Sequence, residues 1–234
     1  MQPAASHAEI ALKDGTIRFD PRRVVHPGAF LFDSAAPENR AQPVQVGGRQ
    51  AAWYTQGEYG AGVLRHYRRG GLIARFSRDR YLWTGVSRVR SFAEFDLLQI
   101  MHAQGLPVPA PLAAVYWRSG MTYRAAILIE RLPRVQTLAK ALDQPSHQAV
   151  ADAIFSMHQA GIWHADLNAY NILLDDHGKA WLIDFDRGHG RGVSPLQRRN
   201  NLLRLRRSLE KVAGPAGLAY WKILDEAYGR CMQR

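Results

Sequence analysis

The chain has 234 residues, of which 47% are hydrophobic, and this suffices for one large domain or two small lobes with a packed core. Its single cysteine, Cys231, excludes an internal disulfide and favours a reducing compartment; the sequence shows neither a secretory signal nor a stretch apolar enough to cross a membrane. The formal net charge of +11 favours anionic partners, namely nucleic acid, phosphorylated substrates or an anionic membrane surface.

The N-terminal part of the chain predicts a β-rich region after an irregular start. Prolines and mixed polarity over residues 1–40 indicate a segment without regular structure. Strand-like stretches at 44–46, 51–55 and 63–67 then alternate with glycine turns. The GEYGAG sequence at 57–62 comes directly before the last of these strands, which indicates a hairpin turn.

A helix and a buried strand are predicted next. Ser91 and Glu94 have the spacing of a capping box, and apolar residues recur at helical spacing until Gly105 can end the helix. The proline-rich stretch after it indicates an extended linker. The AAILIE sequence at 125–130 is typical of a short buried strand, and ERLP at 130–133 indicates a connector between two lobes.

The second half of the chain predicts helices around a short hairpin. Ser146 can cap a helix that Gly161 ends, and two short strands at 171–174 and 181–183 flank a turn. The last forty residues also have a helical pattern. The apolar stripe of the first of these helices consists of Val150, Ala153, Ile154 and Met157.

The order of these elements is strands, helix, strand, connector, helix, loop, hairpin and helices. It predicts an α+β fold with two lobes and a cleft between them. The β-rich N-lobe is expected over residues 1–132 and the α-helical C-lobe over residues 133–234.

The stretch from His164 to Asp186 carries the strongest chemical signal. Asp166 and Asn171 lie five positions apart on one loop, and Asp184 follows a short hairpin. Phosphoryl transfer needs a carboxylate that accepts the proton of the acceptor hydroxyl, and oxygen ligands that hold Mg²⁺ on ATP. The spacing therefore predicts Asp166 as the general base, and Asn171 and Asp184 as magnesium ligands.

Each of these residues also has a purely structural alternative. Asp166 could cap the preceding helix or bond the backbone of its loop, Asn171 could be a turn residue, and Asp184 could simply end a strand. His164 is expected to brace the loop by bonding backbone groups rather than to carry a proton.

The loop HADLNAYN resembles the catalytic loop of the protein-kinase-like fold, in which an arginine usually stands at the position of Ala165. Without that arginine a phosphorylated activation loop has no anchor, which argues against this mode of regulation. Asp184-Phe185-Asp186 resembles the D-F-G motif, with an acid in place of the flexible glycine. The resemblance implies a protein-kinase-like two-lobed fold that binds ATP and Mg²⁺.

Kinases hold the ATP phosphates with a strand lysine that pairs with a helix glutamate. Here the strand before the predicted helix offers Arg65, and Arg75 is a second candidate. Glu94 is the best partner on the helix, unless it serves only the capping box. An arginine would grip phosphate as a planar fork rather than as a point charge.

Two further ATP-binding elements are predicted with the help of this resemblance. Residues 47–50, Gly-Gly-Arg-Gln, lie one strand earlier than the GEYGAG turn and could cover phosphates, although glycine patterns of this kind are weak signals. Glu130 and Leu132 of the predicted connector between the lobes are assigned to the cofactor-binding set.

Five segments together resemble the 3-deoxy-D-manno-octulosonic acid (Kdo) kinase family: 63–71, 90–111, 164–174, 182–188 and 202–211. The resemblance implies transfer of the ATP γ-phosphate to a hydroxyl of Kdo, with the 4-hydroxyl expected. The acceptor would be the lipid A precursor Kdo-lipid IVA, in lipopolysaccharide inner-core biosynthesis. It also implies a cytoplasmic enzyme that works peripherally at the inner membrane of a Gram-negative cell.

Arginine clusters predict the partners. Those at 68–69 and 78–80, and a basic stretch after Asp186, suit the phosphates of a lipid A precursor or an anionic inner-membrane surface, although the stretch could also be a solvated helix face. No nucleic-acid partner is expected, because no nucleic-acid-binding module matches. The alternatives are another kinase of the same fold, acting on a soluble small molecule or a protein, and an inactive scaffold. The basic stretch contains Arg187, Arg191, Arg198, Arg199, Arg204, Arg206 and Arg207.

Overall fold

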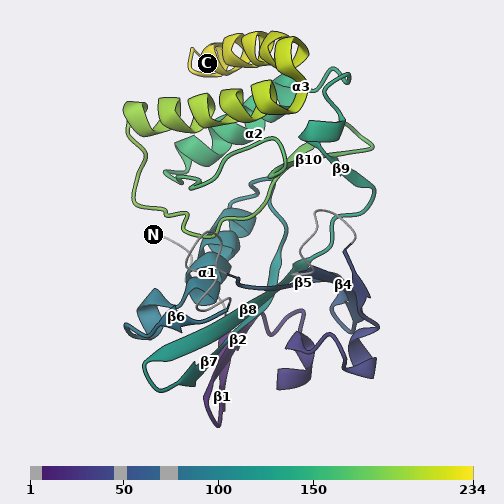
Figure 1. Ribbon diagram of the computed structural model, residues 1–234, viewed down its shortest axis with the longest axis vertical. Coiled ribbons are helices and arrows are strands. Elements are labelled where there is room, and N and C mark those ends of the chain that lie inside the picture. The colour runs from purple at the N-terminus through teal and green to yellow at the C-terminus, as the bar shows by residue number, and fades with distance from the viewer. Residues whose placement is uncertain (1–6, 45–51, 69–78, 234) are drawn as a thin grey trace. The chain divides into compact units, whose positions relative to one another are not determined.

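The computed structural model describes residues 7–44, 52–68 and 79–233 (Figure 1). The chain forms two compact units. The N-terminal unit consists of Met1–Gln99 and Ala110–Arg131, and the C-terminal unit of Ile100–Pro109 and Leu132–Arg234. The first unit is built on an antiparallel sheet and the second mainly on helices. The predicted α+β, kinase-like two-lobed fold is confirmed.

The sheet of the N-terminal unit has the strand order β1-β2-β7-β8-β5-β4-β3, and β6 also pairs with β8. Every pairing is antiparallel. The only long helix of this part of the chain, among the residues described, is α1 (Arg90–Ala103). The strands are β1 (Ala8–Leu12), β2 (Gly15–Phe19), β3 (Gln42–Pro43), β4 (Ala52–Gly57), β5 (Gly60–His66), β6 (Tyr81–Leu82), β7 (Pro111–Ser119) and β8 (Thr122–Glu130).

The first two strands contradict the prediction of an irregular segment over residues 1–40. β1 and β2 form a hairpin in which Ile10 faces Ile17 across the ladder. The signal was present, because apolar residues alternate through both strands and Asp14-Gly15 is a turn sequence. Two 3-10 turns follow, at Ala29–Phe32 (η1) and Pro37–Asn39 (η2), and Leu31 and Phe32 of η1 belong to the hydrophobic core of the sheet.

The stretch that was predicted to be an extended linker contains β7, which is a central strand. β7 lies between β2 and β8, and its residues from Pro111 to Tyr116 are buried. A strand that is covered on both faces shows a continuous apolar run rather than alternation, and the prolines ahead of this run concealed it. The GEYGAG hairpin is confirmed, because Gly57 and Gly60 pair across its two-residue turn.

Helix α1 forms where it was predicted but without the predicted capping box. The helix begins at Arg90, so Ser91 lies inside its first turn, and the Ser91 hydroxyl donates to the carbonyl of Val115 at 2.9 Å. The helix is followed by Gly105, whose φ of +75° suits a helix stop. The predicted apolar stripe is buried: Phe92, Phe95, Leu98 and Met101.

The C-terminal unit has a small antiparallel sheet and two helices. The strand order is β11-β10-β9, and β10 and β11 form the predicted hairpin around the turn at residues 176–179. The elements are β9 (Val135–Thr137), the 3-10 turn η5 (Leu138–Lys140), α2 (His147–Gln159), β10 (Ile172–Asp175), β11 (Ala180–Leu182) and α3 (Pro195–Cys231).

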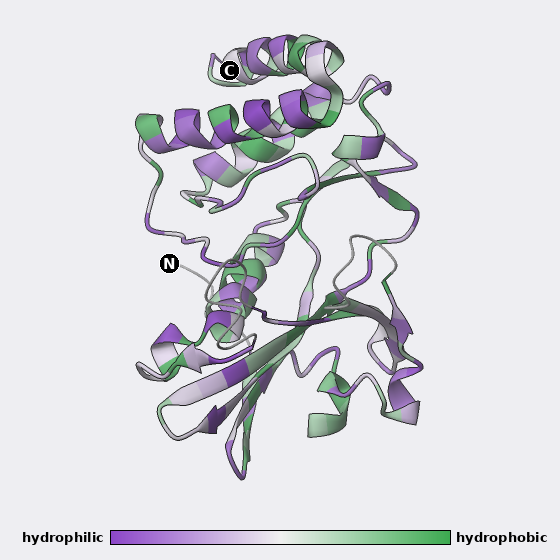
Figure 2. Cartoon of the chain, viewed as in Figure 1, coloured by the Kyte–Doolittle hydropathy of each residue, from purple (hydrophilic) through white to green (hydrophobic). Residues whose placement is uncertain are grey.

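Helix α3 confirms the predicted helical C-terminus and begins at a true capping box. The Ser194 hydroxyl accepts from the Gln197 amide, and the Gln197 side chain accepts from the Ser194 amide. The helix bends at Gly214, which has a φ of +54° and precedes Pro215. Figure 2 shows hydrophilic and hydrophobic residues in alternating bands along it. Over the residues described, no helix has the length and apolar character to cross a bilayer.

Candidate active site

The loop after α2 is braced by His164, as predicted. This side chain is buried, and its Nε2 lies 3.0 Å from the carbonyl oxygen of Ile183. Its Nδ1 accepts a hydrogen bond from the Asp166 amide at 3.0 Å, so Nε2 carries the proton and donates to the carbonyl. Burial lowers the pKa of His164, which keeps the ring neutral and therefore able to accept at Nδ1.

The Asp166 carboxylate is presented to solvent at the turn of this loop, with its side chain 56% exposed. Arg204 of α3 donates to its Oδ1 at 2.6 Å. The guanidinium fixes one oxygen of the carboxylate and leaves the other able to accept a proton. This geometry fits a general base better than the structural alternative of a helix cap.

Asn171 is oriented by the same loop. Its Nδ2 donates to the Asp166 carbonyl at 2.9 Å, which turns its Oδ1 away from that carbonyl. Asn168 holds the turn between them, because its Oδ1 accepts from the amides of Tyr170 at 2.8 Å and Asn171 at 3.2 Å. The Oδ1 of Asn171 is therefore presented as an oxygen ligand.

Asp184 follows β11 at the end of the hairpin, next to Asn171. The Ile183 amide donates to the Asn171 carbonyl at 3.1 Å, so these two residues face each other just beyond the β10–β11 ladder. Asp184 has a φ of +64°, a left-handed conformation that is uncommon outside glycine. A carboxylate and an amide oxygen at neighbouring strand ends form the hard donor set that Mg²⁺ prefers, so these residues fit the predicted metal.

The N-terminal unit contains the predicted arginine–glutamate pair. Nη2 of Arg65, on β5, lies 2.6 Å from both carboxylate oxygens of Glu94, on α1. The hydroxyl of Tyr67 also donates to Glu94, which is buried. With Ser91 bonded to Val115, the capping-box explanation of Glu94 is wrong, and the carboxylate positions Arg65 instead.

Of the other predicted N-lobe residues, the structure describes Glu130 and Leu132 but not Arg75 or residues 47–50. Glu130 ends β8, and its Oε1 lies 3.3 Å from Nη1 of Arg23, while Leu132 follows two residues later and is half-buried. Arg75 and the glycine-rich residues 47–50 lie outside the described residues. The strands that flank 47–50 are β3 and β4, which pair with each other.

Residues 36–228 match a family described as the lipopolysaccharide kinase (Kdo/WaaP) family, and this range includes the loop with Asp166 and Asn171. The chain belongs to this family. The predicted enzyme class, a phosphotransferase with an alcohol group as acceptor, is thereby confirmed.

Two curated relatives illustrate the similarity within the Kdo/WaaP family. A 3-deoxy-D-manno-octulosonic acid kinase of Xanthomonas axonopodis pv. citri (strain 306) is 49% identical over 204 residues, which cover 86% of this chain and 82% of the relative. A protein of the same name from Xylella fastidiosa (strain M12) is 48% identical over 206 residues, covering 86% and 83%. The resemblance on which the sequence interpretation depended is confirmed.

Helix α3 of this family member holds the catalytic loop through residues that the sequence did not single out. Asn201 donates from Nδ2 to the His164 carbonyl at 2.7 Å, and the Ser208 hydroxyl accepts from the Ala169 amide at 3.1 Å. Together with Arg204 they occupy positions i, i+3 and i+7, which lie on one face of a helix. This spacing of polar residues along the sequence is the feature that could have indicated a shared polar face on the helix.

A buried chain of hydrogen bonds extends this brace to the end of α3. His158 donates from Nε2 to Oδ1 of Asn201 at 3.2 Å, and its Nδ1 accepts from the Tyr228 hydroxyl at 2.8 Å. The Asn201 side-chain amide then donates to the His164 carbonyl. A protonated His158 could not accept from the Tyr228 hydroxyl, so the whole chain of hydrogen bonds forms only while His158 is neutral. Burial lowers the pKa of His158 to about 4.

This lowered pKa predicts a loss of stability in mild acid. The unfolded chain takes up a proton at His158 near pH 6.5, whereas the folded chain resists until about pH 4. The contribution is therefore fully present above pH 6.5 and is lost as the pH falls towards 4, by roughly 3 kcal/mol. Urea unfolding of the wild type at pH 7.5, 6, 5 and 4 measures it.

The control is His158→Gln, which can donate to Asn201 and accept from Tyr228 without titrating. Its free energy of unfolding should depend less on pH than that of the wild type, and the difference between the two curves isolates His158 from other titrating groups. Parallel curves for the two proteins would show that His158 does not link protonation to folding.

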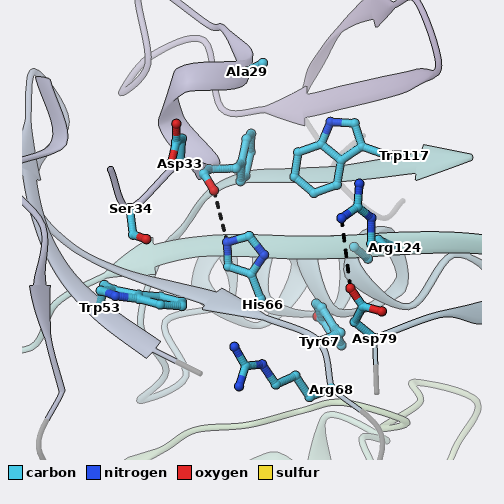
Figure 3. A pocket seen from close by; sticks show the side chains of 12 residues that line it. Ala29, Asp33, Ser34, Trp53, His66, Tyr67, Arg68, Asp79, Trp117 and Arg124 are labelled. Atoms are coloured by element: carbon cyan, nitrogen blue, oxygen red, sulfur yellow. Dashed lines mark hydrogen bonds and ion pairs between the residues drawn. The ribbon is translucent and has the colours of Figure 1, made fainter. Parts of the chain in front are cut away.

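The N-terminal unit also contains a cavity of about 360 Å³ (Figure 3). Its wall includes Trp53, His66 and Trp117, and none of the predicted site residues lines it. His66 follows Arg65 along β5, and successive side chains of a strand point to opposite faces. His66 therefore points away from Glu94, although Tyr67, which donates to Glu94, also belongs to the wall of the cavity.

The arginines after Asp186 do not form one cationic surface. Arg204 pairs with Asp166, and Nη1 of Arg199 lies 2.6 Å from Oδ1 of Asp225. Arg198 donates to the carbonyl of His158 at 3.1 Å. Arg206 and Arg207 are exposed, as predicted. Leu202 and Leu205 are buried, while Leu203 is only half-buried.

Proposed function

We propose that the protein transfers the γ-phosphate of ATP to a Kdo hydroxyl, the 4-hydroxyl, on the lipid A precursor Kdo-lipid IVA, in lipopolysaccharide inner-core biosynthesis. The observation that carries the proposal is the catalytic loop, in which Asp166 is solvent-exposed and held by Arg204 while Asn171 is oriented by the same loop. The names of the curated relatives support Kdo as the acceptor sugar.

In this proposal Asp166 is the catalytic base. Its outer oxygen accepts the proton of the acceptor hydroxyl, which makes that oxygen a nucleophile for the γ-phosphorus. Arg204 is a positioning residue, because its ion pair with Asp166 holds the carboxylate in one rotamer. His164 fixes the loop backbone by accepting from the Asp166 amide. The bond between the γ-phosphorus and the bridging oxygen of ATP breaks as the new phosphate ester forms.

Asn171 and Asp184 would hold Mg²⁺, which when bound neutralises charge on the triphosphate. Arg65, positioned by Glu94, donates to phosphate oxygens from its planar guanidinium. Glu130 and Leu132 are assigned to the same nucleotide-binding set. The proposed division of labour therefore assigns phosphate and adenine binding to residues 1–132, and catalysis and metal binding to residues 133–234.

The proposed setting is the cytoplasmic face of the inner membrane, with peripheral attachment. The acceptor is a lipid, so the enzyme has to meet it at a bilayer surface. The exposed guanidinium groups of Arg206 and Arg207 suit its phosphates or neighbouring anionic lipids. We propose no nucleic-acid partner.

Mass spectrometry of a Kdo-bearing lipid A precursor in detergent micelles, after incubation with the protein and Mg·ATP, tests the proposal. Over the same incubation time we expect a gain of one phosphate with the wild type and far less product with Asp166→Asn, and NMR of the product should locate the phosphate on the 4-hydroxyl. No gain in spite of measurable ATP binding would remove the Kdo assignment, and soluble sugars would be screened next. A phosphate on another hydroxyl would contradict only the position.

A further inference from the structure

One end of the N-terminal sheet exposes apolar side chains among arginines. Met121, in the β7–β8 turn, is 81% exposed, and Leu82, on β6, is 66% exposed. The two lie close together, because Leu82 pairs with Thr122, the neighbour of Met121, and the Trp83 amide donates to the Met121 carbonyl at 2.9 Å. We call this surface the hairpin tip; it consists of Leu82, Trp83, Met121 and the arginines Arg80, Arg88, Arg118 and Arg124.

The hairpin tip is strongly cationic. All four of its arginines are exposed, and the sequence has no acid in residues 80–90 or 111–124. The acids that approach from neighbouring segments are Asp79, whose Oδ2 lies 4.0 Å from Nη1 of Arg124, and Asp14 in the β1–β2 turn (Figure 3). Lys13 stands beside Asp14, so the cations outnumber the acids.

Local packing holds Arg118 beside the apolar residues. The guanidinium of Arg118 lies 4.9 Å from the centre of the Trp83 ring, and its Nε donates to the Gly120 carbonyl at 3.1 Å. Trp83 is half-buried and packs against Tyr116, with 5.1 Å between the ring centres. The tip is therefore a fixed projection, and Met121 at its end adds nothing to the core of the unit.

We propose that the hairpin tip docks on an anionic lipid bilayer. Leucine, methionine and tryptophan enter the boundary between headgroups and acyl chains, while the long arginine side chains keep their guanidinium groups at the level of the lipid phosphates. A nucleic acid would use the charge but not the exposed leucine and methionine. The combination of exposed apolar side chains and exposed arginines favours an anionic bilayer over a protein partner.

This inference deepens the proposed function, because a membrane-borne acceptor requires the enzyme to be at a bilayer. It adds the surface that makes the contact, which is distinct from Arg206 and Arg207 on α3. Its test uses vesicles that contain no acceptor. A failure here is therefore distinguishable from a failure of the Kdo assignment, which is tested in micelles.

The experiment is co-sedimentation of the full chain with phosphatidylcholine vesicles, with and without roughly 30 mol% phosphatidylglycerol, which supplies the negative surface potential that attracts basic segments. We expect binding only to the anionic vesicles. Leu82→Ser with Met121→Ser should weaken it about tenfold or more, and Arg118→Gln should weaken it about fivefold. The matched control is Val25→Ser, which removes an apolar side chain of similar exposure, 68%, from the same unit.

A second measurement keeps the test decisive if the double variant fails to fold. Met121→Cys carries an environment-sensitive fluorophore, which should shift to shorter wavelength on anionic vesicles, whereas the same label at Val25→Cys should not. Cys231 is buried, which limits background labelling. Wild-type protein that ignores anionic vesicles, or a Met121 label that does not respond while the protein binds, would overturn the proposal and leave the tip to a protein partner.

Discussion

Replacing Asp166 by asparagine is expected to lower the rate of phosphoryl transfer by about 10²- to 10⁴-fold, the usual cost of losing a general base, while Mg·ATP still binds. The asparagine keeps the shape of the side chain, and its Oδ1 can still accept from Arg204, which bonds Asp166 at 2.6 Å. What is lost is the ability to accept a proton. Single-turnover kinetics with the lipid acceptor measures the rate, and calorimetry measures nucleotide binding.

The matched control for this variant is Asp176→Asn. Asp176 is also a partly exposed carboxylate paired with an arginine, Arg134, and it lies on the turn of the adjacent β10–β11 hairpin. Its replacement should leave turnover unchanged. Turnover by Asp166→Asn within about threefold of the wild type would contradict the role of base, since it lies far inside the range expected for a lost base.

Replacing Asp184 by asparagine is expected to weaken Mg-dependent nucleotide binding about tenfold or more, because one of the two proposed oxygen ligands of the metal would lose its charge. The left-handed backbone at this position, with a φ of +64°, is one that asparagine tolerates better than most residues. The fold should therefore be preserved. Titration with a non-hydrolysable ATP analogue over a range of Mg²⁺ concentrations measures the effect.

The magnesium dependence separates metal binding from a general loss of affinity. For Asp184→Asn, raising the Mg²⁺ concentration should recover part of the binding, because a weaker metal site is filled by mass action. The control is again Asp176→Asn. An affinity equal to that of the wild type at every Mg²⁺ concentration would remove Asp184 from the metal site.

Local signals in the sequence predicted much of this enzyme. The β10–β11 hairpin, the buried stripe of α2 and the bond from the Asp166 amide to His164 each depend on residues close together in the chain, so their patterns could be read directly. The pair of Arg65 and Glu94 required a strand and a helix to be placed together, and the resemblance to kinases supplied that placement.

Long-range contacts set the limit of the sequence interpretation. β7 was not predicted because a strand that is covered on both faces shows no alternation of apolar and polar residues. The predicted capping box was wrong because Ser91 and Glu94 each bond other residues, Val115 and Arg65. Asn201 and Arg204 could not be assigned to the catalytic loop, because their partners lie 37 and 38 residues away in the chain. Nothing in their local pattern names those partners.

The hydrogen-bond chain from Tyr228 to His164 also determines when this enzyme can become active during its synthesis. The loop of Asp166 leaves the ribosome well before Asn201, and Tyr228 comes 70 residues after His158. Until those residues emerge, His158 and the loop backbone have no α3 to bond, and water takes the place of both partners. A nascent chain can therefore fold its N-terminal sheet early, while its catalytic loop takes its final form only after Asn201 and Tyr228 have emerged.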